Sequence, residues 1–326
     1  MSVLIVNAEQ VRALLPMAEC VDAMEPAMIA ASTGTVAIPP RLISPLIDES
    51  GFFALMPGSS AELGTYGAKV ISLHPANPSQ GLPAIQGFVT LFDHQTGAPV
   101  AIIEGAEVTG IRTAATSGLA TRELARPDAS SCGVFGNGVQ AETHIDAMCA
   151  VRPIEEILIW ARDPGKARDF AAGQAERTGR VVRVTEDPAE AAACDVVCTV
   201  TSSPEPVLNG DWVQPGAHVN LVGAHSLTTR EADTELIAKA ALYVDLMESC
   251  RNEGGDFMIP LKEGAIGEEA LVGEIGQLLN GSIPGRADDQ QITVYNSLGM
   301  TAQDLFAARH VYDRALETGV GLTVEL

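Results

Sequence analysis

The sequence has no long uninterrupted apolar segment and few basic residues. Asp, Glu, Arg or Pro interrupts every apolar run before it reaches the length that spans a membrane, so we expect no membrane-spanning helix. The N-terminus, MSVLIVNAEQ, lacks a basic stretch followed by an apolar one, which predicts no secretory signal. Lys and Arg number 20 against 42 Asp and Glu, for a net charge of −22, so we expect no nucleic-acid partner.

Cysteine is also sparse, and its spacing matches no metal site. The six cysteines are scattered along the chain, which predicts free thiols, no bound metal and a location in the reducing cytoplasm. With 46% apolar and 19% charged residues, the composition is that of a folded globular protein. A length of 326 residues suits two domains of ordinary size.

The hydrophobic pattern predicts two kinds of domain. Residues 8–32 follow a helical pattern, and short, largely antiparallel strands are expected between residues 39 and 107. After a helix at 112–124, strands alternate with helices, which is typical of a parallel sheet built from βαβ units. These strands are predicted at residues 133–135, 157–160, 181–184, 196–199, 219–222 and 242–244.

The predicted fold is therefore α/β, with a Rossmann-type doubly wound parallel sheet in residues 126–294. A smaller α+β domain is expected to comprise residues 1–125 and 295–326. A parallel sheet has no need of the last predicted helix, residues 301–318, so we expect this helix to return to the smaller domain.

The most informative local pattern begins at Gly133. An apolar strand leads into a short glycine-containing turn, and a helical pattern follows at once. Doubly wound proteins hold a dinucleotide pyrophosphate with a strand that turns through glycines into a helix N-terminus. We therefore predict a nicotinamide dinucleotide cofactor. Its expected contacts in the turn are Gly136, Asn137, Gly138, Val139, Gln140 and Ala141.

The residues after the second predicted strand bear on the choice of cofactor. Ala161 stands where an acidic residue usually accepts hydrogen bonds from the ribose 2′-OH, and Arg162 follows it. An arginine there favours the 2′-phosphate of NADP(H). The pattern thus favours NADP(H), although Asp163 could still turn to bind the ribose, and Arg162 could be a solvated loop cation.

Two later strands end in small or hydroxyl-bearing residues. Thr199, Val200 and Thr201 follow one strand, and Val222 and Gly223 follow the next. Because the carboxyl ends of parallel strands face the cofactor crevice, we expect these residues to contact the dinucleotide. His225 comes two residues later and is expected near the nicotinamide ring, with a purely structural role as the alternative.

Six blocks of sequence occur in order with regular spacing. They are residues 67–72, 77–83, 109–115, 136–141, 215–223, and 297–300 together with Gln303 and Asp304. Over nearly the whole chain these blocks resemble the ornithine cyclodeaminase/mu-crystallin family of NAD(P)-dependent enzymes. Members of that family reduce imines of 2-oxo acids, oxidise amino acids to imines, or cyclise diamino acids with loss of ammonia.

The resemblance implies roles for particular residues. Arg41, Lys69 and Arg112 match the family's three cations that bind the substrate's α-carboxylate, and guanidinium groups suit a carboxylate well. Lys69 also interrupts an otherwise apolar strand, where an unpaired ammonium would be costly. The family further implies a homodimer, with the smaller domain binding substrate and forming the dimer. Additional cofactor contacts are expected at Thr113, Ser297 and Gly299.

One position departs from the cyclodeaminases of the family. Those enzymes carry Asp after the Gly-Gly or Gly-Ala pair, whereas this chain has Gly223-Ala224-His225. An imidazole supplies no fixed negative charge to hold a substrate amine, but it can transfer a proton near neutral pH. We therefore expect an NAD(P)H-dependent reductase of small 2-imino acids, with Lys69 and His225 as catalytic residues. The alternatives are an ornithine or lysine cyclodeaminase using catalytic NAD⁺, and a cofactor-binding protein of the mu-crystallin type.

Overall fold

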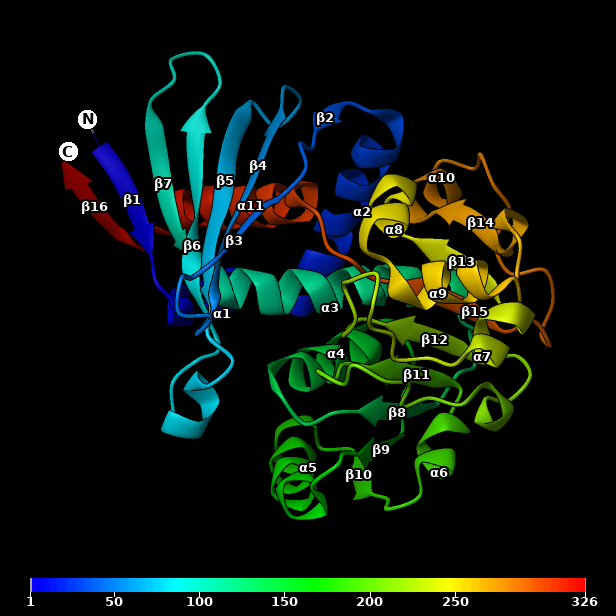
Figure 1. Cartoon of the computed structure of the whole chain (residues 1–326). Helices are drawn as coiled ribbons and strands as arrows, with labels where there is room; N and C mark the ends of the chain where they lie inside the picture. The colour runs from blue at the N-terminus through cyan, green and yellow to red at the C-terminus, as the bar shows by residue number, and fades with distance from the viewer. Residues whose placement is uncertain (1, 326) are drawn as a thin grey trace. The chain divides into compact units, whose positions relative to one another are not determined.

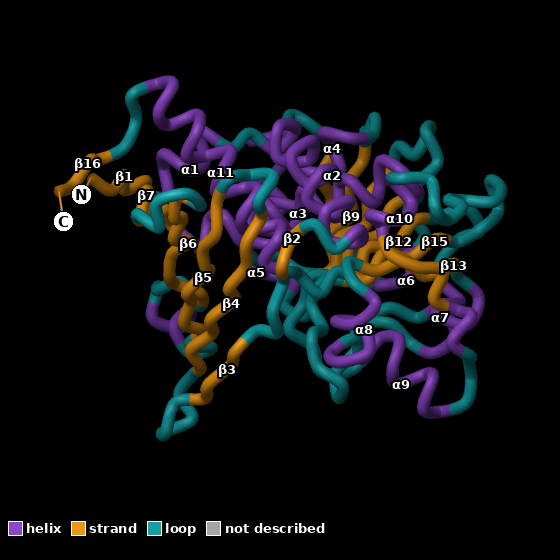
Figure 2. The backbone as a smooth tube through the Cα atoms, turned by 90° about the horizontal axis from the view of Figure 1, so that it is seen from above, coloured by secondary structure: helices purple, strands orange, loops and turns teal. Residues whose placement is uncertain are grey.

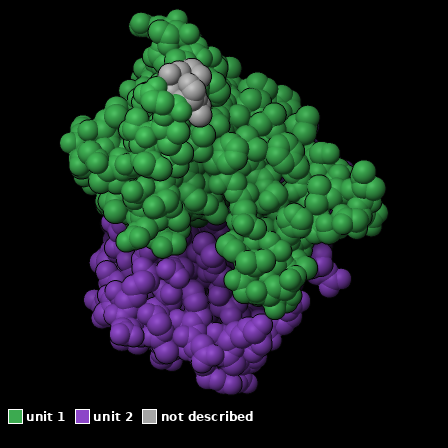
Figure 3. Space-filling model, turned by 90° about the vertical axis from the view of Figure 1, so that its left-hand side faces the viewer, with its two compact units in different colours: residues 1–112, 299–326 green, residues 113–298 purple. Residues whose placement is uncertain are grey.

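The structure is a computed structural model that describes residues 2–325. It divides into two compact units, coloured separately in Figure 3. Unit 1 comprises Met1–Arg112 and Gly299–Leu326, and unit 2 comprises Thr113–Leu298. Among the described helices, none is both long and apolar enough to cross a membrane.

The boundaries between the units differ from the predicted ones, which lay at residues 125/126 and 294/295. The first boundary falls inside helix α3 (Gly105–Leu124), because Arg112 on this helix contacts α11 of unit 1, whereas Ser117 bonds to His144 of unit 2. The second boundary falls at Leu298, because an unpredicted strand, β15 (Thr293–Asn296), extends the sheet of unit 2 to this point.

Unit 1 is an α+β unit built around a mixed sheet (Figure 1). The strand order is β16-β1-β7-β6-β5-β4-β2, and β3 pairs with β4. β1 and β7 are parallel, and the other neighbours are antiparallel. Besides α3, its elements are β1 (Ser2–Val6), α1 (Ala8–Leu14), α2 (Met17–Thr33), β2 (Val36–Ala37), β3 (Leu42–Pro45), β4 (Phe52–Ser60), β5 (Thr65–Leu73), the 3₁₀ turn η1 (Asn77–Gln80), β6 (Ile85–Asp93), β7 (Pro99–Glu104), α11 (Thr301–Thr318) and β16 (Leu322–Glu325).

Local chemistry explains how the helical region at the start of unit 1 is organised. The helical region predicted at residues 8–32 consists of two helices, with Pro16 as the N-cap of the second, where its missing N–H costs no hydrogen bond. α11 lies against α2 and against one face of the sheet, over strands β4 to β7. Figure 2 shows strands β6, β5 and β4 side by side, with β3 at their edge.

Unit 2 contains a wholly parallel sheet with the strand order β10-β9-β8-β11-β12-β15-β13-β14. The chain proceeds from β8 outward to β10, then returns to the other side of β8 with β11. This reversal is the switch point at which open α/β sheets bind ligands. Its elements are β8 (Ser131–Phe135), α4 (Val139–Val151), β9 (Glu156–Trp160), α5 (Pro164–Thr178), β10 (Val181–Val184), α6 (Pro188–Ala192), β11 (Val196–Thr199), η2 (Gly210–Trp212), β12 (His218–Leu221), α7 (Thr234–Lys239), β13 (Ala241–Val244), α8 (Met247–Glu253), α9 (Gly255–Glu263), η3 (Glu268–Ala270), β14 (Leu271–Glu274), α10 (Ile275–Leu279) and β15.

Buried strands explain why unit 2 is stable as a parallel sheet. β11, β12 and β15 are buried along their whole length, as expected for strands covered on both faces. Their apolar side chains, among them Val197, Val219 and Val294, join one continuous core. The α/β fold class predicted from the sequence is confirmed, with a parallel sheet in one unit and a mixed sheet in the other.

Candidate functional site

Three basic side chains of unit 1 gather at the start of α11. Arg41 lies in the loop before β3, Lys69 on β5 and Arg112 on α3. Lys69 Nζ donates a hydrogen bond to Asp304 Oδ1 at 3.0 Å, and Arg112 Nε donates to the same oxygen at 2.9 Å. Arg41 Nη2 donates to the carbonyl of Gly299 at 2.7 Å. The structure thus brings the three predicted carboxylate-binding residues into one group.

Gly299 makes this grouping sterically possible. Its φ is 76°, and a Cβ at this position would lie 2.8 Å from Arg112 Nη1. Both the left-handed backbone and the close guanidinium therefore require glycine here. The resemblance implied a cofactor contact for Gly299, and this contact stays a prediction; the structure places the residue in unit 1, beside Arg41 and Arg112.

The group concentrates charged side chains in a buried place. Lys69, Arg112 and Asp304 are 1%, 4% and 0% exposed. Asp304 supplies one negative charge to these two cations, and its Oδ2 is buried with no hydrogen bond from a described residue. Buried charge is costly unless it is compensated. The arrangement is therefore suited to a small anion such as a carboxylate.

The acidity of Lys69 reflects this environment. Burial is the main cause that lowers the pKa of Lys69 to about 8, and the nearby charges of Arg112 and Arg41 act in the same direction. Asp304 opposes the shift through its charge and its hydrogen bond. Because an arriving anion would favour the charged ammonium, anion binding and protonation of Lys69 are coupled.

Sequence reasoning assigned no role to Asp304 or to Gln303. Gln303 Oε1 accepts a hydrogen bond from Arg112 Nη1, so both residues at the start of α11 orient the cations. The sequence could have identified Asp304. A lysine inside an apolar strand needs a buried counter-charge, and Asp304 is an acidic residue among the apolar residues of a helix that is expected to be buried.

In unit 2, β8 leads into α4 through the turn at Gly136–Ala141, here called the pyrophosphate loop. Gly136 has φ 130°, which favours glycine. Gly138 is the N-cap of α4, and no described side chain caps this helix end. A Cβ on Gly138 would meet no atom within 4 Å. The first N–H groups of α4 and its positive dipole end therefore have room for an anionic group, so these residues fit a dinucleotide.

The three residues after β9 differ in their surroundings. Asp163 is the N-cap of α5, and its Oδ1 accepts hydrogen bonds from the N–H groups of Gly165 (3.0 Å) and Lys166 (3.2 Å). Ala161 is half-buried, and Arg162 is exposed. Because Asp163 is already engaged in capping, turning this carboxylate to a ribose would cost α5 its cap.

The segments after β11 and β12 are neighbours because these strands pair. Thr199 ends β11, with Val200 and Thr201 directly after it, and Val222 and Gly223 follow β12. Val200 N donates to the carbonyl of Phe135 at the end of β8, at 3.0 Å. Three of the predicted cofactor-binding segments thus converge at the carboxyl ends of β8, β11 and β12.

The remaining predicted residues also lie in unit 2, whereas the three cations lie in unit 1. His225 is exposed in the loop after β12. Ser297 follows β15 and is 3% exposed, and its Oγ makes no hydrogen bond with a described residue. Thr113 is buried on α3. Within residues 2–325, no group of three or more His, Cys, Asp and Glu side chains is arranged to hold a metal ion.

The parallel sheet, the pyrophosphate loop and the buried cations are together typical of an enzyme that binds a dinucleotide and a small anion. The chain belongs to the ornithine cyclodeaminase/mu-crystallin family, whose model matches residues 1–319. The resemblance seen in the sequence is therefore confirmed.

Individual relatives match over the whole length of the chain. A Delta(1)-pyrroline-2-carboxylate reductase from Bacillus cereus is 36% identical over 324 residues, which is 99% of each chain. The solved structure of the Thermococcus litoralis Delta(1)-pyrroline-2-carboxylate reductase in complex with NADH and L-proline has a TM-score of 0.95 at 36% identity, covering 98% of this chain and 100% of the other. An archaeal alanine dehydrogenase dimer with bound NAD has a TM-score of 0.93 at 32% identity, covering 100% of both chains.

Proposed function

We propose that this chain is an NAD(P)H-dependent reductase that converts small 2-imino acids into L-amino acids. The observation that carries this proposal is the buried grouping of Lys69 and Arg112 around Asp304, in a family whose members act on imino and amino acids. A cyclic substrate is supported by relatives named as Delta(1)-pyrroline-2-carboxylate reductases, one of them solved with L-proline. A reaction that uses NADH or NADPH fits the cytoplasmic location expected from the sequence.

In this proposal, Arg41, Lys69 and Arg112 bind the α-carboxylate and so fix the position of Cα. Holding the reacting carbon in one orientation contributes to the rate through proximity. A nicotinamide dinucleotide, when bound, supplies the hydride. The pyrophosphate loop of unit 2 would hold its phosphates through the N–H groups at the start of α4. His225 is the proposed proton donor to the substrate nitrogen.

The surroundings of Lys69 favour a reductase over a cyclodeaminase. Met56 on β4 and Val89 on β6 are the residues directly opposite Lys69, and both are buried. Neither can hold a second amine of a diamino acid. The carboxylate of Asp304, which accepts a hydrogen bond from Lys69, is already shared with Arg112. An imino acid with an uncharged side chain suits these neighbours better than ornithine or lysine does.

The activity can be tested by following the absorbance of NADH and NADPH with a panel of 2-imino acids. The panel contains pyrroline-2-carboxylate, piperideine-2-carboxylate, and linear imines formed from 2-oxo acids and ammonia. We expect cofactor oxidation with at least one of them, and the same 2-oxo acids without ammonia serve as the control. The proposal is wrong if no imine is turned over. Ammonia release from ornithine or lysine without net formation of NADH would instead identify a cyclodeaminase.

We further propose a preference for NADP(H) over NAD(H). Arg162 is exposed at the carboxyl end of β9, where a guanidinium can contact a 2′-phosphate. The nearest acidic side chain in sequence, that of Asp163, is engaged as the cap of α5. Both observations support the preference, although the two solved relatives described above hold NADH and NAD.

Replacing Arg162 with alanine is expected to lower the ratio of kcat/KM for NADPH to that for NADH by about tenfold. The lost interaction is a charge-assisted hydrogen bond to the 2′-phosphate, and tenfold corresponds to about 1.4 kcal/mol. Arg168→Ala is the matched control, because Arg168 lies on the adjoining helix α5 with an exposed side chain. A wild-type chain that prefers NADH, or an unchanged ratio in Arg162→Ala, would contradict the assignment.

We also propose that the active form is a homodimer, assembled through the sheet of unit 1. The face that carries Ala54 and Met56 is buried, whereas Phe53 and Phe88 on the alternate face are 40% and 39% exposed. An exposed apolar surface on a sheet is typical of an interaction site, and one relative is described as a dimer. Sedimentation should give twice the chain mass of 34.1 kDa, and a single-chain mass would contradict the proposal.

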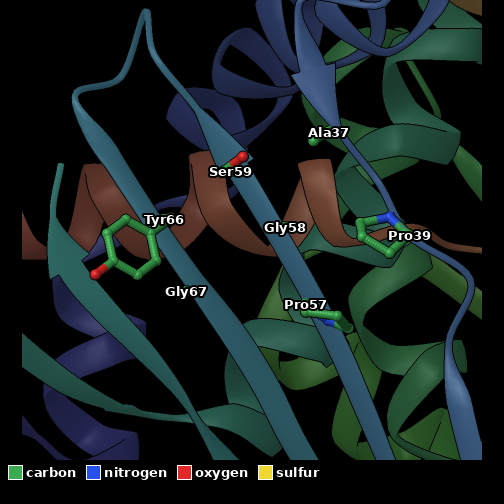
Figure 4. Close-up of a pocket in the computed structure, with 7 residues that line it drawn as sticks. All are labelled: Ala37, Pro39, Pro57, Gly58, Ser59, Tyr66 and Gly67. Carbon is green, nitrogen blue, oxygen red and sulfur yellow. The ribbon is translucent and has the colours of Figure 1, made fainter. Parts of the chain in front are cut away.

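The sheet of unit 1 also has an open hollow of about 240 Å³ beside β4 and β5 (Figure 4), lined by Ala37, Pro39, Pro57, Gly58, Ser59, Tyr66 and Gly67.

A further inference from the structure

Glu231 is a fully buried carboxyl group in unit 2 that joins two segments of the proposed cofactor site. Its Oε1 accepts hydrogen bonds from Thr201 N at 2.8 Å and from Thr201 Oγ1 at 2.6 Å. Its Oε2 accepts from Thr199 Oγ1 at 2.8 Å, from Gly223 N at 2.6 Å and from Val222 N at 3.4 Å. One side chain therefore links the end of β11 to the end of β12.

The backbone around Glu231 is itself held in place. The N–H groups of Glu231 and Ala232 donate to Asp256 Oδ1 at 2.9 and 3.0 Å. The carbonyl of Glu231 accepts from Val207 N at 2.8 Å and from Leu208 N at 3.0 Å. Because Asp256 is 1% exposed and Glu231 0%, water does not compete for these bonds. Glu231 is thus a fixed point to which the ends of both strands are attached.

We propose that Glu231 is a positioning residue for the dinucleotide, an inference that rests on the proposed function. The linked segments lie beside the switch point of the parallel sheet, where such sheets bind nucleotides. By engaging the N–H groups of Thr201 and Gly223, Glu231 fixes both segments before the cofactor arrives. The cofactor then binds a preformed wall and need not order two loops, which is the way preorganisation increases affinity.

An isosteric amide distinguishes this role from simple packing. Three of the five donors are backbone N–H groups, and they occupy both oxygens of Glu231. Burial raises the pKa of Glu231, and the hydrogen bonds oppose this shift. Both carboxyl oxygens have lone pairs that can accept a hydrogen bond, whether the group is charged or protonated. Glutamine replaces one oxygen with an NH₂ group that cannot accept. In Glu231→Gln, the backbone N–H of either Thr201 or Gly223 must therefore lose its acceptor, whichever way the amide turns.

The test compares Glu231→Gln with Glu235→Gln in the full chain. Glu235 lies on α7 with an exposed side chain, so its replacement removes the same charge without this network. Titration of NADH and NADPH fluorescence should show at least a tenfold loss of affinity in Glu231→Gln and a change of less than twofold in Glu235→Gln. Turnover at saturating cofactor should fall less than the cofactor KM rises. Unchanged affinity in Glu231→Gln would overturn the inference.

Hydrogen exchange of the wild-type chain without cofactor keeps the inference testable even when Glu231→Gln folds poorly. The amides of Thr201 and Gly223 should already exchange slowly, since both donate to a buried acceptor. If they exchange freely and become protected only when NADH or NADPH is added, the wall is not preformed and the inference is wrong. Failure of the proposed function looks different: cofactor binds and depends on Glu231, but no imine is reduced.

Discussion

Replacing Asp304 with asparagine is expected to destabilise the chain by about 3 kcal/mol or more, which is the cost of leaving buried cations without their counter-charge. Lys69 and Arg112 both bond to Asp304 Oδ1, and all three side chains are almost fully buried. Thermal or urea unfolding of the purified variant measures the loss. Asp313→Asn is the matched control on the same helix, because Asp313 forms only a half-exposed pair with Arg309, of a kind that contributes about 0.3–0.5 kcal/mol.

The pH dependence of the same variant gives an independent check. The pKa of Lys69 is lowered from 10.5 to about 8 in the folded chain, so the unfolded chain binds more protons between these values. Stability from this group therefore rises as the pH increases through that window. Asp304 raises the pKa of Lys69, so without Asp304 the pKa in the folded chain falls further, and the pH range over which stability rises extends to lower pH. Raising the pH from 7 to 9 should thus recover more stability in Asp304→Asn than in the wild type. Equal stability of the two proteins at pH 7 would contradict the role given to Asp304.

Replacing Lys69 with methionine is expected to lower kcat/KM for the imino acid about 10- to 150-fold, because a hydrogen bond to a charged group contributes about 1.5–3 kcal/mol. Methionine has a similar length, so the cavity stays filled, and Asp304 keeps its bond to Arg112. Because Arg112 still compensates the charge of Asp304, no buried charge is left unpaired, and the unfolding free energy should not fall. Activity and stability are thus expected to change in different directions.

The controls for Lys69→Met separate substrate binding from general damage. Lys262→Met removes a lysine from an exposed position on α9 and should leave kcat/KM within twofold of the wild type. Affinity for NADH and NADPH, measured by fluorescence, should be unchanged in Lys69→Met, because the proposed dinucleotide contacts lie in unit 2. Full kcat/KM in Lys69→Met would remove the carboxylate-binding role, and lost cofactor affinity would point to a wider disturbance.

Local patterns in the sequence were sufficient for much of the fold. The glycine turn after β8 predicted the pyrophosphate loop, and the period of the last helix predicted α11 at Thr301–Thr318, as observed. Strands without a local signal were missed. β15 is four residues long and follows a long irregular segment, and it enters the sheet between β12 and β13. Its place depends on pairing with strands far away in the sequence, which no local period encodes.

A site residue can be predicted from the sequence when it is charged and the residues around it are apolar. Lys69 stands out because it is an ammonium in an apolar strand, so a search for its partner is justified from the sequence alone. Glu231 carries no such signal, since it lies in the polar stretch Arg230-Glu231-Ala232-Asp233, which is typical of a surface loop. Only the paired ends of β11 and β12 reveal that its carboxyl group is enclosed. Partners that meet through tertiary structure are therefore the part that sequence reasoning could not supply.

The crowding at Gly299 has a practical consequence for directed evolution of substrate range. Any mutation at this codon would force a side chain against the guanidinium of Arg112, so a saturation library at position 299 should consist almost entirely of inactive clones. Met56 and Val89 offer the opposite prospect, because they flank Lys69 and carry neither charge nor polar hydrogen. Under the proposed function, randomising these two codons would vary the surroundings of Lys69 without replacing any of the three proposed carboxylate-binding residues.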